Sequence, residues 1–370
     1  MRIPLSAPDI TESEIEAVVR VLRTPRLSLG PVTEEFEAAV ASFVSLPQAI
    51  AVSSGTAGLH LCVRALDIGE GDEVIVPSFT FIAAANVIRY ERAVPVFVDI
   101  DPETLNVDSD KIEAAITPRT RAILVPHTFG RPAEMDSILE ISERHGLMVI
   151  EDACEAIGAE YRGRKAGSMG HVGVFAFYPN KQITTGEGGV VVTTDPLLAK
   201  RIRALRNQGR YPTDDWLQHT ELGYNYRISE INCALGLAQM ARLKEILLMR
   251  EAVAGAYDQR LQTFADLVLP SLALPAGRIS WFVYVVRVRS TRSRDTIVDG
   301  LTAAGIACGR YFAPIHLQPS YGAWRTSPHL AVTEAEASRT LALPFFNRIE
   351  TSAIDEVCHT LGRLLQGESC

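Results

Sequence analysis

The sequence predicts an α/β protein in which helices cover both faces of a largely parallel sheet, with a smaller α+β domain towards the C-terminus. Apolar strands alternate with helical segments along the first half of the chain, and this alternation is typical of parallel sheets. The chain has 370 residues, enough for a large core and two domains. The pattern changes after a long helical stretch at 229–264. We therefore expect a large domain at 1–245 and a small one at 246–370.

Periodicity and apolar runs place the elements in order. Amphipathic helices are expected at 11–22, which opens with the capping-box pattern Thr11 to Glu14, and at 33–43. The strands expected in the large domain are 49–52, 73–77, 94–99, 122–126, 147–150, 171–174 and 190–194. The helices expected between them and after them are 59–66, 81–90, 108–116, 134–145 and 196–207. The small domain is expected to contain a strand at 280–288, a loop or edge strand at 310–316, and helices at 293–304, 333–340 and 353–365.

The composition limits the class of protein. Hydrophobic residues make up 47% and charged residues 22%, as in ordinary soluble proteins. The formal net charge of -8 argues against a general nucleic-acid binder. Six cysteines without C-x-x-C spacing favour reduced thiols over a disulfide framework or a metal site. The start of the chain lacks a signal-peptide core, and no uncharged apolar run approaches the ~18 residues of a membrane span. We expect a cytoplasmic protein without metal, membrane or nucleic-acid partners.

A turn of small residues, Ser53 to Gly58, connects the strand at 49–52 to the helix at 59–66. A turn of this kind at a helix start offers free N–H groups and the positive end of the helix dipole to a phosphate. Thr56 adds a hydroxyl group beside Gly55. The spacing and the lysine of a P-loop are missing. Such turns also serve as plain helix caps, so the turn alone leaves both interpretations open.

A single lysine, Lys181, lies on the loop between the strands at 171–174 and 190–194. Glycines at 186, 188 and 189 permit close backbone approaches in this loop. Lysines usually reach solvent, and a solvated loop lysine is the simpler interpretation. A lysine held between buried strands is desolvated, which favours the neutral amine and allows a Schiff base with an aldehyde.

An acidic pair, Glu151 and Asp152, follows the apolar run at 147–150. This pair favours the Schiff-base interpretation of Lys181 over that of a solvated loop lysine. The carboxyl end of a strand is where open α/β sheets bind ligands. A buried carboxylate needs a cation or hydrogen bonds, and a protonated pyridine nitrogen would satisfy Asp152. A lysine for an aldehyde and an aspartate for a ring nitrogen are what pyridoxal phosphate requires. Phe79, just past the strand at 73–77, is placed to stack on a flat ring, although a core aromatic is the alternative.

Several motifs in order resemble those of the DegT/StrS-type pyridoxal-phosphate-dependent sugar aminotransferases, which have the aspartate-aminotransferase fold (fold type I). The resemblance covers almost the whole chain. The matching segments are Ser53–Ala57, Pro77–Phe81, Val98–Thr104, His127–Gly130, Glu151–Ala153, the lysine loop and Gly223–Arg227. The resemblance implies a mostly parallel sheet of the seven-stranded type. Some relatives replace the lysine with histidine and dehydrate sugars, so the presence of Lys181 favours transamination.

The resemblance also implies roles for the matching residues. Lys181 would hold the cofactor as a Schiff base and move a proton once it is freed. Asp152 would pair with the ring nitrogen, Gly55 and Thr56 would bind the phosphate, and Phe79 would stack on the ring. Asn225 resembles the residue that reaches the cofactor phosphate of the neighbouring subunit. The implied assembly is a homodimer with active sites at the subunit interface.

Two positions depart from the common family pattern. Many members have a serine where this chain has Ala176, and a glutamine, which contacts the phenolic oxygen of the ring, where it has Glu155. Both variants resemble the branch that aminates C4 of 4-keto-6-deoxy sugar nucleotides, the perosamine synthases. Because an anionic Glu155 would repel a phenolate, we expect it to be protonated or to bond a protonated phenol or imine. Further candidates for substrate contacts are His127, Arg227, Tyr311 and His316.

The predicted activity is transfer of the amino group of L-glutamate to the keto carbon, expected at C4, of a nucleotide-linked 4-keto-6-deoxy sugar. A C3 sugar or keto-cyclitol aminotransferase is the first alternative. A lyase or decarboxylase on the same fold is another, because bond choice depends on substrate orientation. A non-catalytic, cofactor-binding regulatory protein is the alternative from a different class.

Overall fold

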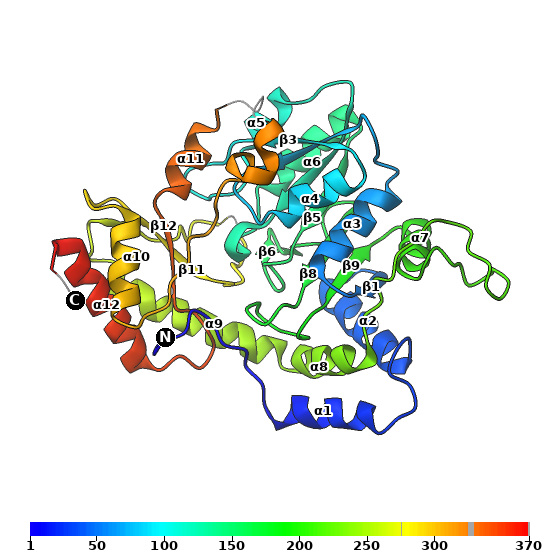
Figure 1. Ribbon diagram of the computed structural model, residues 1–370, viewed down its shortest axis with the longest axis horizontal. Coiled ribbons are helices and arrows are strands. Elements are labelled where there is room, and N and C mark those ends of the chain that lie inside the picture. The colour runs from blue at the N-terminus through cyan, green and yellow to red at the C-terminus, as the bar shows by residue number, and fades with distance from the viewer. Residues whose placement is uncertain (275, 325–328, 369–370) are drawn as a thin grey trace.

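The computed structural model describes residues 1–274, 276–324 and 329–368, and its centre is a seven-stranded sheet (Figure 1). Strand β9 is antiparallel to both of its neighbours, and all the other adjacent pairs in this sheet are parallel. The order across the sheet is β1 (Gln48–Val52), β9 (Gly189–Thr193), β8 (Val172–Ala176), β5 (Met148–Asp152), β4 (Thr120–Pro126), β2 (Glu73–Pro77) and β3 (Val94–Val98). The predicted α/β class with a mostly parallel sheet is confirmed.

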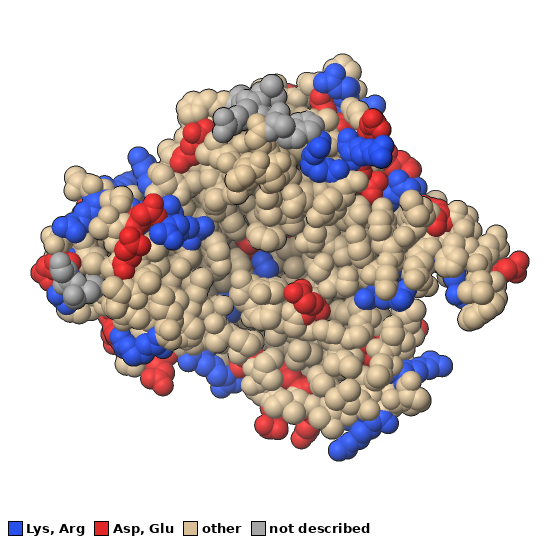
Figure 2. Space-filling model, viewed as in Figure 1, with Lys and Arg blue, Asp and Glu red and all other residues tan. Residues whose placement is uncertain are grey.

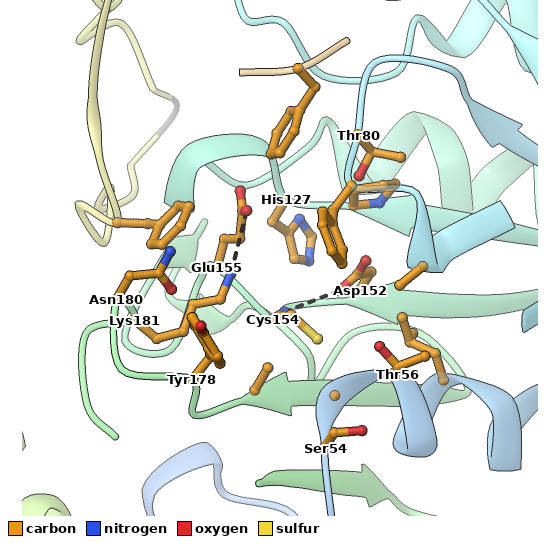
Figure 3. Close-up of a pocket in the computed structure, with 18 of the residues that line it drawn as sticks. Ser54, Thr56, Thr80, His127, Asp152, Cys154, Glu155, Tyr178, Asn180 and Lys181 are labelled. Atoms are coloured by element: carbon orange, nitrogen blue, oxygen red, sulfur yellow. Dashed lines mark hydrogen bonds and ion pairs between the residues drawn. The ribbon is translucent and has the colours of Figure 1, made fainter. Parts of the chain in front are cut away.

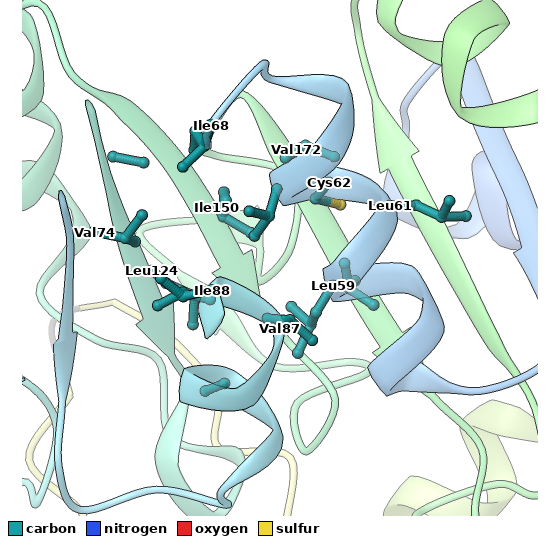
Figure 4. Close-up of a cluster of buried hydrophobic side chains, with 14 of the residues drawn as sticks. Leu59, Leu61, Cys62, Ile68, Val74, Val87, Ile88, Leu124, Ile150 and Val172 are labelled. Carbon is teal, nitrogen blue, oxygen red and sulfur yellow. The ribbon is translucent and has the colours of Figure 1, made fainter. Parts of the chain in front are cut away.

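Helices cover both faces of this sheet. On one face α3 (Gly55–Ala65), α4 (Ala83–Tyr90) and α7 (Pro196–Arg206) pack over a core that includes Leu61, Ile88 and Ile150 (Figure 4). Successive strand residues alternate between the two faces, so Val149, the neighbour of Ile150, points to the other face, where α6 (Met135–His145) packs. Helices α1 (Glu12–Leu22), α2 (Pro31–Val44), α5 (Ser109–Ala114) and α8 (Glu230–Ala241) complete the surroundings of the sheet. Burial on both faces explains the continuous apolar strands.

A second, three-stranded antiparallel sheet lies in the C-terminal part, in the order β10 (Leu267–Val268), β11 (Tyr284–Val288) and β12 (Thr340–Leu343). It shares a core with α9 (Leu243–Leu261), α10 (Arg294–Ala303) and α12 (Thr351–Gln366), and Ile3 from the N-terminal segment joins that core. The boundary between residues 245 and 246 falls inside α9 and stays a prediction. The helical stretch expected at 229–264 is two helices, α8 and α9, which meet at Arg242.

The small-domain elements differ most from expectation. The strand expected at 280–288 begins only at Tyr284, and the helix expected at 333–340 is α11 (Ala331–Ala337). Thr340 instead opens β12, a short apolar strand that exists because it pairs with β11, far away in the sequence. The two-stranded hairpin of β6 (Glu160–Tyr161) and β7 (Arg164–Lys165) was also not predicted. The segment at 310–316 is a loop that leads into a 3-10 turn, Ile315–Leu317.

Two further properties concern the environment of the chain. Within the described ranges, no helix combines the length and the apolar character needed to cross a bilayer. The thiols of Cys62, Cys154, Cys233, Cys308 and Cys358 are free, and Cys370 lies outside the described residues.

Candidate active site

A cavity of about 500 Å³ lies where the parallel strands β4 and β5 end, between the large sheet and the C-terminal part. Figure 2 shows the hollow in the middle of the molecule, with a basic and an acidic side chain at its floor. Its lining comes from the start of α3, the segment after β2, the ends of β4 and β5, the loop after β8, and residues 282, 311 and 312. This is the position at which open α/β sheets bind ligands.

The start of α3 forms one wall of the cavity. Ser54 caps the helix, and its Oγ accepts a hydrogen bond from the N–H of Ala57 at 3.0 Å. The N–H groups of Gly55 and Thr56 precede the first intrahelical bond, so they are available to an anion. A Cβ at Gly55 would lie 2.6 Å from the Cβ of Ala176. Only glycine therefore allows β8 to pack this close to the turn.

Asp152 lies at the end of β5 and points into the cavity (Figure 3). Its Oδ1 accepts a hydrogen bond from the N–H of Cys154 at 3.2 Å. Asp152 is only 9% exposed. Even so, no lysine, arginine or histidine among the described residues forms an ion pair with its carboxylate. A nearly buried carboxylate without a cation is a site for a ligand that brings a positive charge or a proton.

Lys181 and Glu155 lie next to each other in the cavity lining and form an ion pair (Figure 3). The Nζ of Lys181 lies 3.4 Å from Oε1 of Glu155 and 4.0 Å from the ring centroid of Phe282. The other carboxylate oxygen, Oε2, accepts a hydrogen bond from the N–H of Phe129 at 3.0 Å. Burial raises the pKa of Glu155, and the positive charge of Lys181 opposes that rise. This direction favours the protonated form of Glu155, which is one of the two expected states.

The lysine loop is held by its own hydrogen bonds. The N–H of Lys181 donates to the carbonyl of Tyr178 at 2.9 Å, and the hydroxyl of Thr184 donates to the carbonyl of Phe177 at 3.0 Å. Gln182 Nε2 donates to the carbonyl of Glu155 at 2.6 Å. These bonds fix the backbone on both sides of Lys181, so its amine enters the cavity from a rigid support.

Phe79, which was expected to stack on the ring, does not line the cavity. Its side chain is fully buried outside the cavity and packs edge-on against Phe129 and Phe312, with ring centroids 6.0 and 5.8 Å away. Phe81, two residues further on, lines the cavity and is 59% exposed. The chain bends after β2 ends at Pro77, and the direction of each side chain beyond that point depends on the bend, which the sequence pattern does not give.

Of the residues expected to contact substrate, two line the cavity and two do not. Tyr311 and His127 line it, but both ring nitrogens of His127 are engaged, by Glu151 Oε2 at 2.8 Å and by the N–H of Ala133 at 3.1 Å. His127 is therefore unable to donate a hydrogen bond into the cavity. His316 Nδ1 instead contacts Ser78 Oγ at 2.7 Å. Arg227 donates to the Asn207 side chain at 2.9 Å, away from the cavity.

Asn225 is exposed and does not line the cavity of its own chain. Several lining residues were not predicted as site residues. They are Ser54, Thr80, Phe81, Cys154, Tyr178, Asn180, Glu187, Phe282 and Phe312. Tyr178 and Asn180 lie just before Lys181 in the sequence, and this closeness could have indicated them as site residues. Among the described residues, Oδ1 of Asn180 is buried without a hydrogen-bond partner. Phe282 and Phe312 come from the C-terminal part, and no local pattern connects them with Lys181.

The residues present fit pyridoxal phosphate. One cavity holds N–H groups at a helix start for a phosphate, an unpaired carboxylate for a ring nitrogen, and a lysine amine for an aldehyde. The described residues contain no group of three or more histidine, cysteine, aspartate or glutamate side chains arranged to hold a metal ion.

Fold and cavity together define a pyridoxal-phosphate-dependent aminotransferase, and comparison with known proteins gives the family. Residues 8–362 match the DegT/DnrJ/EryC1/StrS aminotransferase family, and the chain belongs to it. The predicted resemblance, cofactor and enzyme class are thereby confirmed.

Individual relatives match over nearly their full length. The chain is 43% identical to the GDP-perosamine synthase of Caulobacter vibrioides over 368 residues, 98% of each chain. It is 34% identical to the aminotransferase TlmJ from Streptoalloteichus hindustanus, with a TM-score of 0.94 and 99% of each chain covered. The PLP form of Spr1654 from Streptococcus pneumoniae is 27% identical, with a TM-score of 0.93 and 99% of each chain covered.

Proposed function

We propose that the protein aminates C4 of a nucleotide-linked 4-keto-6-deoxy sugar with L-glutamate as the amino donor. The observation that carries this proposal is the 43% identity with a GDP-perosamine synthase over 98% of both chains. Ala176 and Glu155, the two residues that resemble the C4 branch, both line the cavity, which supports the same substrate class. The free thiols of five cysteines support a cytoplasmic location, because a reducing compartment keeps cysteines in this form.

The chain's own residues have separate tasks in this reaction. When bound, pyridoxal phosphate supplies an aldehyde that exchanges amines and a ring that withdraws electrons. Lys181 provides the amine that bonds the aldehyde, and once freed it holds and moves a proton at Nζ. Asp152 would keep a proton on the ring nitrogen of the bound cofactor. Glu155 contacts Lys181 Nζ at 3.4 Å, and its raised pKa makes it suited to hold a proton near the reacting centre.

A homodimer with shared active sites is part of the proposal. The described lining of the cavity contains three acidic residues, namely Asp152, Glu155 and Glu187. Lys181 is the only lysine or arginine in that described lining. Cofactor and substrate both carry phosphates, so further donors are needed. Asn225 is exposed, and we propose that it reaches the cofactor phosphate of a second copy.

Mixed dimers test the shared site. Lys181→Ala and Asn225→Ala subunits, co-expressed with two different tags, should each be impaired as homodimers. Their heterodimer should regain one working site, made from Lys181 of one chain and Asn225 of the other. No regain of cofactor binding or turnover in the purified heterodimer would contradict the shared site.

The substrate is tested with purified enzyme in two half-reactions. L-Glutamate should convert the cofactor to its amine form and release 2-oxoglutarate, which separates transamination from decarboxylation. A panel of 4-keto and 3-keto nucleotide sugars and keto-cyclitols is then added, and the absorbance of the aldehyde form is followed. Only a 4-keto-6-deoxy sugar nucleotide should restore it. Restoration by a 3-keto sugar or a keto-cyclitol would replace the proposed substrate, and the absence of any half-reaction with amino donors would indicate a regulatory protein.

A further inference from the structure

A cluster of four side chains, here named the His60 cluster, consists of the buried His60 and the half-buried Glu91, Tyr224 and Tyr226. His60 lies on α3, and the start of this helix, Ser54–Thr56, is here named the phosphate turn. Glu91 follows the last residue of α4. The two tyrosines belong to the segment that carries Asn225 between them. The cavity lining does not include any of the four side chains, so the reaction described above leaves them without a role.

The hydrogen bonds of the His60 cluster have defined directions. His60 Nε2 lies 2.8 Å from Glu91 Oε1, and His60 Nδ1 lies 3.0 Å from the hydroxyl of Tyr226. The hydroxyl of Tyr224 donates to the same Glu91 oxygen at 2.9 Å. A carboxylate accepts, so Nε2 carries the proton, and Nδ1 of the neutral ring accepts from Tyr226. Both tyrosine hydroxyls therefore have an acceptor in the cluster, and partial burial strengthens these bonds relative to bonds in water.

Ring contacts reinforce these bonds. The rings of Tyr224 and Tyr226 stack with centroids 5.0 Å apart, and the His60 ring lies 4.7 Å from Tyr224 and 5.8 Å from Tyr226. The Tyr90 ring packs edge-on against His60 at 5.2 Å, and Arg64 Nη1 lies 3.3 Å from Glu91. The tyrosine pair is thus held on both its rings and its hydroxyls.

Backbone bonds orient the residue between the tyrosines. The N–H of Tyr224 donates to the carbonyl of Leu205 at 2.7 Å, and the N–H of Tyr226 donates to the carbonyl of Arg206 at 3.0 Å. The N–H of Ser53, next to the phosphate turn, donates to the carbonyl of Tyr226 at 2.8 Å. In this extended arrangement alternate side chains point in opposite directions, so anchoring both tyrosines inward turns Asn225 outward, where it is exposed.

We propose that the His60 cluster is a positioning device that presents Asn225 to the cofactor phosphate of a second copy of the chain. The inference rests on the shared active site proposed above. His60, Glu91, Tyr224 and Tyr226 are positioning residues, because they act through Asn225 and touch neither cofactor nor substrate in their own chain.

Removing the two hydroxyls tests this role with little change of shape. The double variant Tyr224→Phe/Tyr226→Phe should bind pyridoxal phosphate about tenfold more weakly, the effect of losing one hydrogen bond to a charged group. Binding is measured by absorbance titration of the cofactor-free dimer. Asn225→Ala should show a loss of the same size, and the triple variant should lose no more. Tyr257→Phe is the matched control, since it removes a buried hydroxyl that donates to the carbonyl of Pro344 at 2.7 Å in the other core.

A mixed dimer separates positioning from a merely structural role. Tyr224→Phe/Tyr226→Phe subunits are co-expressed with Lys181→Ala subunits, and cofactor bound per heterodimer is measured. One site should bind with wild-type affinity, because its Asn225 comes from the subunit with an intact cluster. Failure to restore that site, or losses that add in the triple variant, would overturn the inference. If Asn225→Ala binds the cofactor like wild type, the shared site itself fails and the inference fails with it. If only the double variant binds like wild type, the inference alone fails.

Discussion

Glu151 and Asp152 are neighbours at the end of β5, yet their surroundings on the two sides of the sheet differ completely. Glu151 is fully buried on one side, and its carboxylate accepts hydrogen bonds from the N–H groups of Gly167, Met169 and Gly170 and from His127 Nε2. Asp152 points to the cavity side, and within the described ranges its carboxylate accepts a hydrogen bond from the N–H of Cys154.

The difference separates a structural carboxylate from a chemical one. Glu151 fastens the chain before β8, and with it the approach to the lysine loop, because its lone pairs are used by backbone donors. Asp152 keeps accepting capacity for a ligand. Successive strand residues point to opposite faces, so two identical charges one residue apart acquire opposite roles. The same substitution should therefore have different effects at the two positions.

The largest effect is expected on the cavity side, at the amine. Lys181→Ala should reduce transamination to background, because no other described lysine lines the cavity to bond the cofactor aldehyde. The absorbance of the lysine-bound cofactor should disappear, while the circular-dichroism spectrum stays that of the folded protein. Normal turnover by this variant would mean that the site is wrongly assigned.

Asp152→Asn is expected to have the next largest effect on activity. The kcat/KM for the amino donor should fall about 10²–10³-fold, because an amide does not keep a proton on the ring nitrogen. The cofactor-free protein should be no less stable than wild type, since the substitution removes a buried charge that has no cation. Steady-state kinetics and thermal unfolding measure the two quantities. A large loss of stability with activity retained would mean that Asp152 is the structural carboxylate of the pair.

Glu151→Gln should show the opposite pattern. Three backbone N–H donors and one histidine lose a charged acceptor, so the free energy of unfolding should fall by about 2–4 kcal/mol. This is measured as a lower denaturant midpoint with cofactor saturating. The kcat of the folded fraction should stay within a few-fold of wild type. The comparison would break if kcat dropped as far as in Asp152→Asn.

The smallest effect concerns the pH dependence of stability at Glu155. Burial raises its pKa, so the folded state binds this proton more tightly than the unfolded state. Its contribution to stability is therefore present below the ordinary glutamate pKa and is lost as pH rises through the raised value. Relative to wild type, cofactor-free Glu155→Gln should gain melting temperature as pH increases from about 4.5 towards neutrality. A difference in melting temperature between the two proteins that does not change with pH would argue against a raised pKa of Glu155 in the folded state.

Much of the site could be predicted because its parts are local patterns. The turn at Gly55, the acid after the apolar run and the lysine between glycine-rich and aromatic residues each occupy a short stretch, and all of them line one cavity. The expected site residues that do not line the cavity share a different cause. Phe79 and Phe81 both follow β2, and only the bend of the chain turns the second towards the cavity. His316 contacts Ser78 and not the cavity because of a non-local hydrogen bond.

The sequence by itself determined the alternation of strands and helices in the large domain, the α/β class and the identities of the amine and the carboxylate, because burial periodicity and reactive side chains are properties of short segments. Tertiary structure decided that β12 pairs with β11, and that residues near 282 and 312 lie beside Lys181 in one cavity. These outcomes depend on contacts between segments more than 50 residues apart, and no local pattern records them.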